Sequence, residues 1–272
     1  MKYKIVACDM DGTLLNGEGQ LTERTVSTIN RCANEGLYVT LCTGRPYVAL
    51  APYLEKLDIR IPLITYNGGI LADAKTGEAL YERGLSKEDT LAVLEVGKKL
   101  GISMTVWARN ELFMNRMDEM GKIYKKAVFV EPVMFDPENP CFTDRNVTKY
   151  LWYAPEKDVK ELMKVLPGML PDTVACFTST PEYIEIVRKD VNKGDALYAL
   201  CDCLGIPREE SVAVGDGLND LSMIKAAGLG VAMKNAAEEV TKAAKYVTSS
   251  NNEDGVAELL CLLLEGRLEK ES

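Results

Sequence analysis

Short, continuously apolar runs alternate with helical patterns at both ends of the chain, and this alternation restricts the fold more than any other feature. In the first third, KIVAC (Lys4–Cys8) and LYVTLC (Leu37–Cys42) are such runs. Between them, apolar residues recur at helical spacing over Leu21–Glu35, and Gly36 ends the pattern. Strands without polar alternation are typical of a parallel sheet that helices cover on both faces. The other elements expected here are a helix over Pro46–Leu57 and a strand over Leu63–Tyr66.

The middle of the chain has a different pattern. Two apolar runs around Arg109-Asn110 predict a hairpin, and Ser86 begins a helix with a capping-box-like sequence. Paired strands with intervening helices indicate an α+β sheet that is open on one face. The last third returns to alternation, with strands expected at Ser211–Val214, Gly230–Met233 and Tyr246–Thr248, and helices at Lys193–Leu204, Asp220–Ala227 and Ala236–Ala244.

The simplest architecture that joins these parts is an α/β core built from both ends of the chain, with a smaller domain inserted into it. Residues 1–84 and 189–272 are expected to form the core, and residues 85–188 the inserted α+β domain. A chain of 272 residues is long enough for two domains, and a hydrophobic content of 47 % can supply their cores.

Composition favours a cytoplasmic protein. No run of about 18 uninterrupted apolar residues could span a membrane. The N-terminal MKYKIVACDMDG meets acidic residues too early for a secretory signal, so we expect a cytoplasmic protein without a membrane partner. The eight cysteines form no CxxC pair and most lie in apolar runs, which is typical of free thiols in a reducing compartment.

Charge and residue usage exclude several classes of function. The net charge of −9 argues against a nucleic-acid partner, which requires a basic face. The chain contains no histidine, so Ser-His-Asp and Cys-His catalysis and His-ligated zinc are excluded. Acid–base chemistry must therefore use carboxylates, Lys, Tyr or Cys.

Polar residues of a particular kind follow three of the expected strands. KIVAC leads into DMDGTL, LYVTLC into TGR, and SVAVG into DGLND; a fourth segment, NKG, begins a helix. In open α/β sheets, ligands bind outside the carboxyl ends of the strands, so these segments should converge on one site.

Asp9 and Asp216 supply the hard carboxylate oxygens that Mg2+ prefers, and Asp11 is a third metal-ligand candidate. Asp9 is also the expected nucleophile, because a carboxylate can attack phosphorus and form an acyl phosphate. Asp11, two residues on, could protonate the leaving alcohol and then activate the hydrolytic water.

The other polar residues of these segments are suited to holding a phosphoryl group. Phosphoryl transfer depends mostly on positioning and charge stabilisation, which a hydroxyl, backbone N–H groups and a fixed ammonium provide. Asp220 is expected to hold Asp216 and the metal's waters in place, with Asn219 beside it. Thr43 and Lys193 are counted as catalytic, and the substrate-binding residues expected are Gly12, Thr13, Gly44, Arg45 and Asn219.

Taken together, the motifs resemble those of the haloacid dehalogenase superfamily of aspartate-nucleophile phosphatases. DMDGTL, TLCTGR, Lys193 and GDGLND match its four motifs in order. The long insert between the second and third motifs is similar to that of the Cof-type sugar-phosphatase branch, which carries a type 2 cap. The stretches NGG, GLGVAMKNA and SNNEDGVA, which lie outside the insert, are also typical of that branch. This resemblance covers nearly the whole chain and is weakest in the insert. It implies a Rossmann-like core, Mg2+ dependence and a small phosphorylated metabolite as substrate.

Each motif alone has an ordinary explanation, since DxDGT, TGR and GDGxND all occur in plain turns and most lysines are solvated. Their joint occurrence, in order, at the expected strand and helix ends favours the site. Cys261 and Arg267 have the spacing of a cysteine-phosphatase loop, but this apolar run is expected to be a core helix. Two alternatives stay open: a phosphomutase acting on sugar phosphates and a non-catalytic phospho-ligand sensor. The sequence leaves the substrate and the oligomeric state undetermined.

Overall fold

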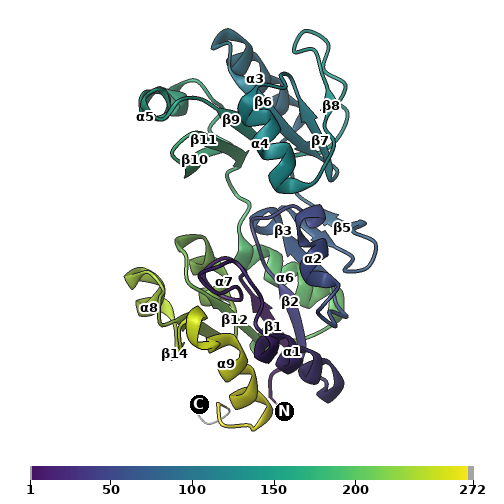
Figure 1. The fold of residues 1–272 in the computed structure, drawn as a ribbon, viewed down its shortest axis with the longest axis vertical. Coiled ribbons are helices and arrows are strands. Elements are labelled where there is room, and N and C mark those ends of the chain that lie inside the picture. Colours follow the sequence, from purple (N-terminus) through teal and green to yellow (C-terminus); the bar gives the residue numbers. More distant parts are fainter. Residues whose placement is uncertain (1, 269–272) are drawn as a thin grey trace. The chain divides into compact units, whose positions relative to one another are not determined.

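The computed structural model describes residues 2–268, which form an α/β fold of two compact units (Figure 1). The core domain comprises the residues up to Tyr81 and those from Asn192 onward, and the inserted domain comprises Glu82–Val191. A parallel sheet lies in the first unit and a mostly antiparallel sheet in the second. This confirms the fold class predicted from the alternation of strands and helices.

The core domain is built on a five-stranded parallel sheet with the order β14-β13-β12-β1-β2. The first and last thirds of the chain meet where β1 pairs with β12, with Ile5 opposite Ser211. All residues of β1 and β12 are buried, which explains why these strands lack polar alternation. The strands are β1 Ile5–Cys8, β2 Tyr38–Leu41, β12 Ser211–Gly215, β13 Leu229–Met233 and β14 Tyr246–Thr248.

Helices cover both faces of this sheet (Figure 1). Val6 and Cys8 of β1 pack in the cluster that contains α1 and α9 side chains. Ile5 and Ala7, which point the other way, pack with side chains of α6 and α7. The core helices are α1 Glu23–Glu35, α2 Ala51–Leu54, α6 Lys193–Leu204, α7 Leu221–Ala226, α8 Glu238–Ala243 and α9 Gly255–Leu264.

The segment after β2 departs from the expected single helix over residues 46–57. It forms a 3-10 turn, Tyr47–Leu50, followed by the four-residue α2. Pro52 explains the correction, because proline has no N–H to donate and its ring clashes with the carbonyl of the preceding turn. The strand expected over residues 63–66 is present as β3 Leu63–Thr65. It belongs to a small sheet that was not foreseen, with β4 Ile70–Ala72 and β5 Ala79–Glu82.

The inserted domain contains a six-stranded sheet with the order β10-β11-β9-β6-β7-β8. The predicted hairpin is present, with Arg109 and Asn110 both at positive φ in its turn. Helices α3 and α5 contribute Val93 and Val159 to the cluster on one face. The strands are β6 Ser103–Ala108, β7 Glu111–Met114, β8 Val133–Met134, β9 Val147–Tyr153, β10 Val174–Thr180 and β11 Tyr183–Arg188, and the helices are α3 Lys87–Lys99, α4 Glu119–Val128 and α5 Glu156–Val165.

The other face of this sheet is less open than expected. Trp107 and Lys149 are buried there, and the Trp107 indole N–H donates to the hydroxyl of Tyr124 in α4 over 2.9 Å. The Lys149 ammonium pairs with Glu185 of β11 at 3.1 Å. Helix α4 therefore covers part of the face that the strand pattern leaves polar.

Two further expectations from composition can be compared with the structure. All eight cysteines are free thiols, and Cys261 lies in the core helix α9. Within residues 2–268, no helix combines the length and apolar character that a membrane span requires.

Candidate active site

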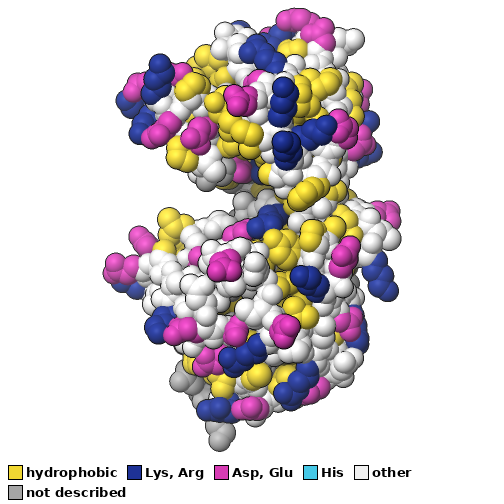
Figure 2. Space-filling model, in the orientation of Figure 1, with side chains coloured by type: hydrophobic (Ala, Val, Ile, Leu, Met, Phe, Trp, Pro, Cys, Tyr) yellow, Lys and Arg dark blue, Asp and Glu magenta, His cyan; other side chains and the backbone are white. Residues whose placement is uncertain are grey.

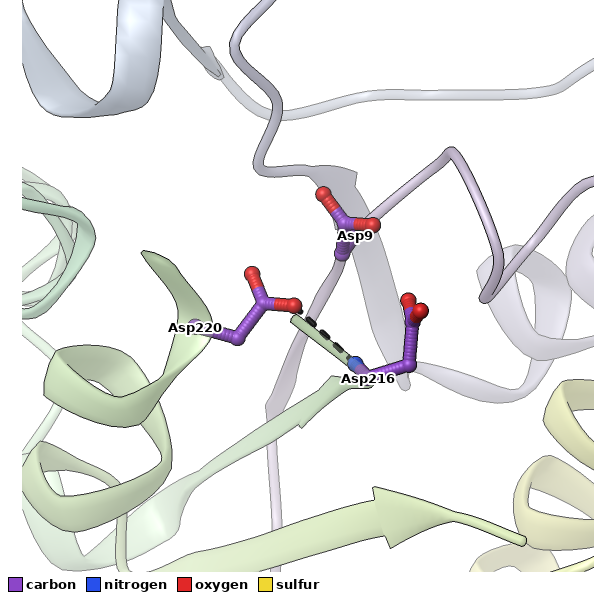
Figure 3. A group of neighbouring side chains, drawn as sticks. All are labelled: Asp9, Asp216 and Asp220. Atoms are coloured by element: carbon purple, nitrogen blue, oxygen red, sulfur yellow. Dashed lines mark hydrogen bonds between the residues drawn. The ribbon is translucent and has the colours of Figure 1, made fainter. Parts of the chain in front are cut away.

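Four chain segments bring charged and hydroxyl side chains to the carboxyl edge of the parallel sheet. Asp9 follows β1, Thr43 lies just beyond β2, and Asp216 follows β12. Lys193 is the first residue of α6. Figure 3 shows the carboxylates of Asp9, Asp216 and Asp220 gathered at this edge, and one oxygen from each lies within 4.8 Å of the others.

Lys193 is the charge at the centre of the site. Its side chain is fully buried, and its ammonium donates to Asp9 Oδ1 at 2.5 Å and to Asp220 Oδ1 at 2.6 Å. Burial alone would lower the pKa of Lys193, but the neighbouring carboxylates raise it above its ordinary value. The helix start fixes its position, because Asn192 caps α6 by accepting from the backbone N–H of Asp195.

Asp220 acts as a support for the other charged residues. One oxygen accepts from Lys193. The other accepts from the backbone N–H of Asp216 at 3.0 Å, drawn as a dashed line in Figure 3, and from that of Gly217 at 2.9 Å. Gly215 allows this approach, since a Cβ there would lie 2.5 Å from the Asp220 carboxylate. With both oxygens occupied, Asp220 is better suited to orienting Lys193 and Asp216 than to binding a metal directly.

Asp216 is held from the side of the first motif. The Thr13 hydroxyl donates to Asp216 Oδ1 at 2.6 Å. Gly12 packs against the same carboxylate: its φ is +85°, and a Cβ would lie 2.4 Å from Asp216 Oδ2. Only glycine satisfies both the left-handed backbone and the close approach. The side-chain amide of Asn235 donates to the Gly12 carbonyl at 2.8 Å and holds this turn from a third segment.

The donor set fits a small divalent cation. If Asp9, Asp216 and Asp220 are all ionised, the one ammonium of Lys193 leaves this group with a formal charge of −2. Burial raises the pKa of Asp9 and of Asp216, which shows that the charged forms lack full compensation. Asp9 Oδ2 and Asp216 Oδ2 accept no hydrogen bond from the residues that the structure describes, so both can bind a cation. Hard carboxylate oxygens of this kind suit Mg2+.

Asp11, which the sequence analysis predicts as a third metal ligand, has its side chain outside this carboxylate group. Its exposed side chain forms a bidentate pair with Arg45, with Arg45 Nε to Oδ2 at 2.9 Å and Arg45 Nη2 to Oδ1 at 2.6 Å. Arg45 also donates to the Tyr53 hydroxyl at 3.2 Å, and its guanidinium lies 5.3 Å from the Tyr53 ring centre. Asp11 and Arg45, expected to act on substrate, are thus partners of each other in this conformation.

The second-motif loop is compact. Thr43 is buried, and its hydroxyl oxygen accepts from the Arg45 N–H at 3.2 Å. Gly44 lies against the Asn67 amide, and Asn67 in turn accepts from Asn219 Nδ2 at 3.1 Å. Asn67 and Asn235 lie in the NGG and GLGVAMKNA stretches, and no role for either residue was predicted from the sequence. Asn67 stands before two glycines and Asn235 stands just after a strand, and both patterns are also typical of plain turns.

Comparisons with known proteins agree with this geometry. Residues 6–260 match the family described as haloacid dehalogenase-like hydrolase. Two 5-amino-6-(5-phospho-D-ribitylamino)uracil phosphatases of Bacillus subtilis strain 168 are similar to this chain. YcsE is 32 % identical and covers 94 % of each chain. YwtE is 30 % identical and covers 97 % of this chain and 99 % of its own.

Solved structures give the same result. TM0651 from Thermotoga maritima has a TM-score of 0.86 at 31 % identity, covering 95 % of this chain and 96 % of its own. BT4131, described as a sugar phosphatase of haloacid dehalogenase subclass IIB, has a TM-score of 0.75 at 26 % identity, covering 96 % and 98 %.

Proposed function

Since the chain belongs to the haloacid dehalogenase-like hydrolases and is a phosphoric monoester hydrolase, we propose that it hydrolyses a small phosphorylated metabolite through a phospho-aspartate on Asp9, with Mg2+ as cofactor. The observation that carries this proposal is the placement of Asp9. One of its carboxylate oxygens is held by Lys193 at 2.5 Å, and the other accepts no hydrogen bond within residues 2–268. A nucleophile needs this combination of fixed orientation and an available lone pair.

In the first step, a carboxylate oxygen of Asp9 attacks phosphorus, and the bond from phosphorus to the leaving oxygen breaks. Asp11 supplies a proton to that oxygen. In the second step, Asp11 takes a proton from water, the water oxygen bonds to phosphorus, and the bond to Asp9 breaks with release of inorganic phosphate. Because Asp11 is paired with Arg45, its role requires it to exchange Arg45 for the leaving group.

Asp9 and Asp216 are the residues proposed to hold Mg2+ through their carboxylates. The ion would neutralise the charge of the group and of the phosphoryl oxygens. Lys193 adds a fixed positive charge at Asp9, and Asp220 keeps Lys193 and Asp216 oriented. Thr43, the Gly12–Thr13 and Gly44 backbone, Arg45 and Asn219 are proposed to contact the phosphoryl group.

A sugar phosphate or a phosphorylated polyol derivative is the substrate class we propose. Support comes from the relatives, because two are named for a phosphoribityl substrate and one solved structure is described as a sugar phosphatase. The net charge of −9 argues against nucleic-acid substrates. We propose a cytoplasmic location, which the eight free thiols support, since two of them, Cys141 and Cys203, are exposed.

Phosphate release from a panel of phosphorylated sugars, polyols and nucleotides tests the proposal. We expect release that requires Mg2+, stops in EDTA and returns when Mg2+ is restored. Full activity in the chelator would refute the metal assignment. An isomerised sugar phosphate without free phosphate would identify a phosphomutase instead, although the relatives' names support hydrolysis.

A further inference from the structure

The loop after β3 has an unusual backbone for which the proposed mechanism gives no reason. Tyr66, Asn67 and Gly68 have φ values of +51°, +55° and +103°, so three successive residues are in the left-handed region. Glycine adopts it freely and asparagine tolerates it, but tyrosine rarely does. Strained backbone of this kind persists where surrounding contacts fix it, and it is concentrated at functional sites.

Those contacts connect the loop to three of the four motif segments. The Asn67 N–H donates to the Thr43 carbonyl at 2.9 Å, which joins the loop to the second motif. Gly68 lies so close to the third segment that a Cβ would be 2.3 Å from the Asn192 carbonyl oxygen. Asn67 Oδ1 accepts from Asn219 Nδ2 at 3.1 Å, which joins the loop to the fourth motif.

The position of the Asn67 side chain is as specific as that of its backbone. A Cβ on Gly44 would lie 3.0 Å from Asn67 Nδ2, so the amide occupies the space that any other residue at position 44 would fill. The amide therefore lies between the second-motif backbone and Asn219. Asn219 gives one of its two Nδ2 hydrogens to Asn67, so the other Nδ2 hydrogen remains to donate to a phosphoryl oxygen.

We propose that Asn67 is a positioning residue for the phosphatase reaction: its side-chain oxygen holds the Asn219 amide in the orientation that binds the phosphoryl group, and its left-handed backbone fixes that oxygen relative to Thr43. This inference rests on the proposed function, because it requires Asn219 to contact substrate. Asn67 itself touches none of the three carboxylates, which are held by Lys193 and Thr13 instead. Mg2+ binding should therefore be independent of Asn67.

The test is a double-mutant cycle with Asn67→Gly and Asn219→Ala. Glycine keeps the positive φ at no steric cost and removes only the amide. We expect Asn67→Gly to lower kcat/KM about tenfold, the upper range for one lost hydrogen bond. If Asn67 acts through Asn219, the double variant should be no less active than Asn219→Ala alone. The Mg2+ concentration for half-maximal activity should stay within about twofold of that of the unchanged protein.

A matched control is Asn110→Gly, the same replacement at another left-handed asparagine, in the hairpin of the inserted domain. It should leave kcat/KM unchanged. If Asn67→Gly does not fold, Asn67→Asp replaces it. The carboxylate still accepts from Asn219, so Asn219→Ala should lower activity by the same factor in the aspartate background as in the unchanged protein.

Two results would overturn the inference: losses from Asn67→Gly and Asn219→Ala that multiply in the double variant, or an Asn67→Gly protein with unchanged kinetics. A rise in the Mg2+ concentration for half-maximal activity of Asn67→Gly would also contradict it, because it would show that the whole site is distorted. Failure of the proposed function gives a different result, since the unchanged protein would then release no phosphate from any substrate in the panel.

Discussion

Replacing Lys193 with methionine tests the electrostatic balance of the site. The substitution keeps a long side chain but removes an ammonium that contacts Asp9 at 2.5 Å and Asp220 at 2.6 Å, all of them nearly fully buried. At an effective dielectric constant of ~20, each contact is worth ~6 kcal/mol before desolvation is counted. Desolvation offsets much of this, and removing one partner of a buried ion pair destabilises by ~3–5 kcal/mol. We expect that loss in the free energy of unfolding when no divalent cation is present.

The assay is urea unfolding in EDTA, followed by two probes. Both tryptophans, Trp107 and Trp152, lie in the inserted domain, so their fluorescence reports that domain, whereas far-ultraviolet circular dichroism also follows the core. Lys193→Met should shift the core transition to lower urea. Lys149→Met is the matched control, because Lys149 is a buried lysine paired with Glu185 in the inserted domain. It should shift the fluorescence transition.

Adding Mg2+ completes the experiment. Removal of Lys193 makes the formal charge of the site −3 in place of −2, so Mg2+ should bind the variant more tightly and raise its stability by more than that of the unchanged protein. Lys149→Met should show the ordinary response to Mg2+. An unfolding midpoint for Lys193→Met equal to that of the unchanged protein in EDTA would refute the reasoning, as would equal Mg2+ stabilisation of the two proteins.

The remaining predictions concern the first motif. Gly12→Ala should raise the Mg2+ concentration needed for half-maximal activity at least about tenfold, because a Cβ would lie 2.4 Å from Asp216 Oδ2 and the φ of +85° is unfavourable for alanine. An unchanged midpoint in a Mg2+ titration of activity would contradict the account. Asp11→Asn should slow phosphate release from sugar phosphates by about 10²–10⁴-fold. The first step should slow much less with p-nitrophenyl phosphate, because its leaving group needs little protonation. Equal losses of first-step rate for both substrates in pre-steady-state measurements would show that Asp11 is not the acid.

The parts of the fold predicted from sequence are those fixed by burial. Strands such as β1 and β12 are covered on both faces, so their residues must be continuously apolar, and the pattern is visible without any structure. The carboxyl-edge position of Asp9 and Asp216 follows from parallel topology alone. The hairpin at Arg109-Asn110 was visible because an apolar run lies on each side of this turn.

Features that depend on single backbone constraints or on contacts distant in sequence were missed. The helix expected over residues 46–57 is interrupted because Pro52 lacks an N–H, a local effect that the apolar spacing conceals. The Asp11–Arg45 pair joins residues 34 positions apart, and composition cannot indicate that two functional residues bind each other. The inserted unit spans Glu82–Val191, three residues beyond the expected range of 85–188 at each end.

The most direct test of the central claim is to locate the covalent phosphate. Protein mixed with a phosphate-labelled substrate and Mg2+, quenched in acid within one turnover and digested, should carry the label on the peptide that contains Asp9, and hydroxylamine should release it as expected for an acyl phosphate. Asp9→Asn should carry no label and lose activity by several orders of magnitude. Label on a different residue, or near-normal turnover by Asp9→Asn, would contradict the account.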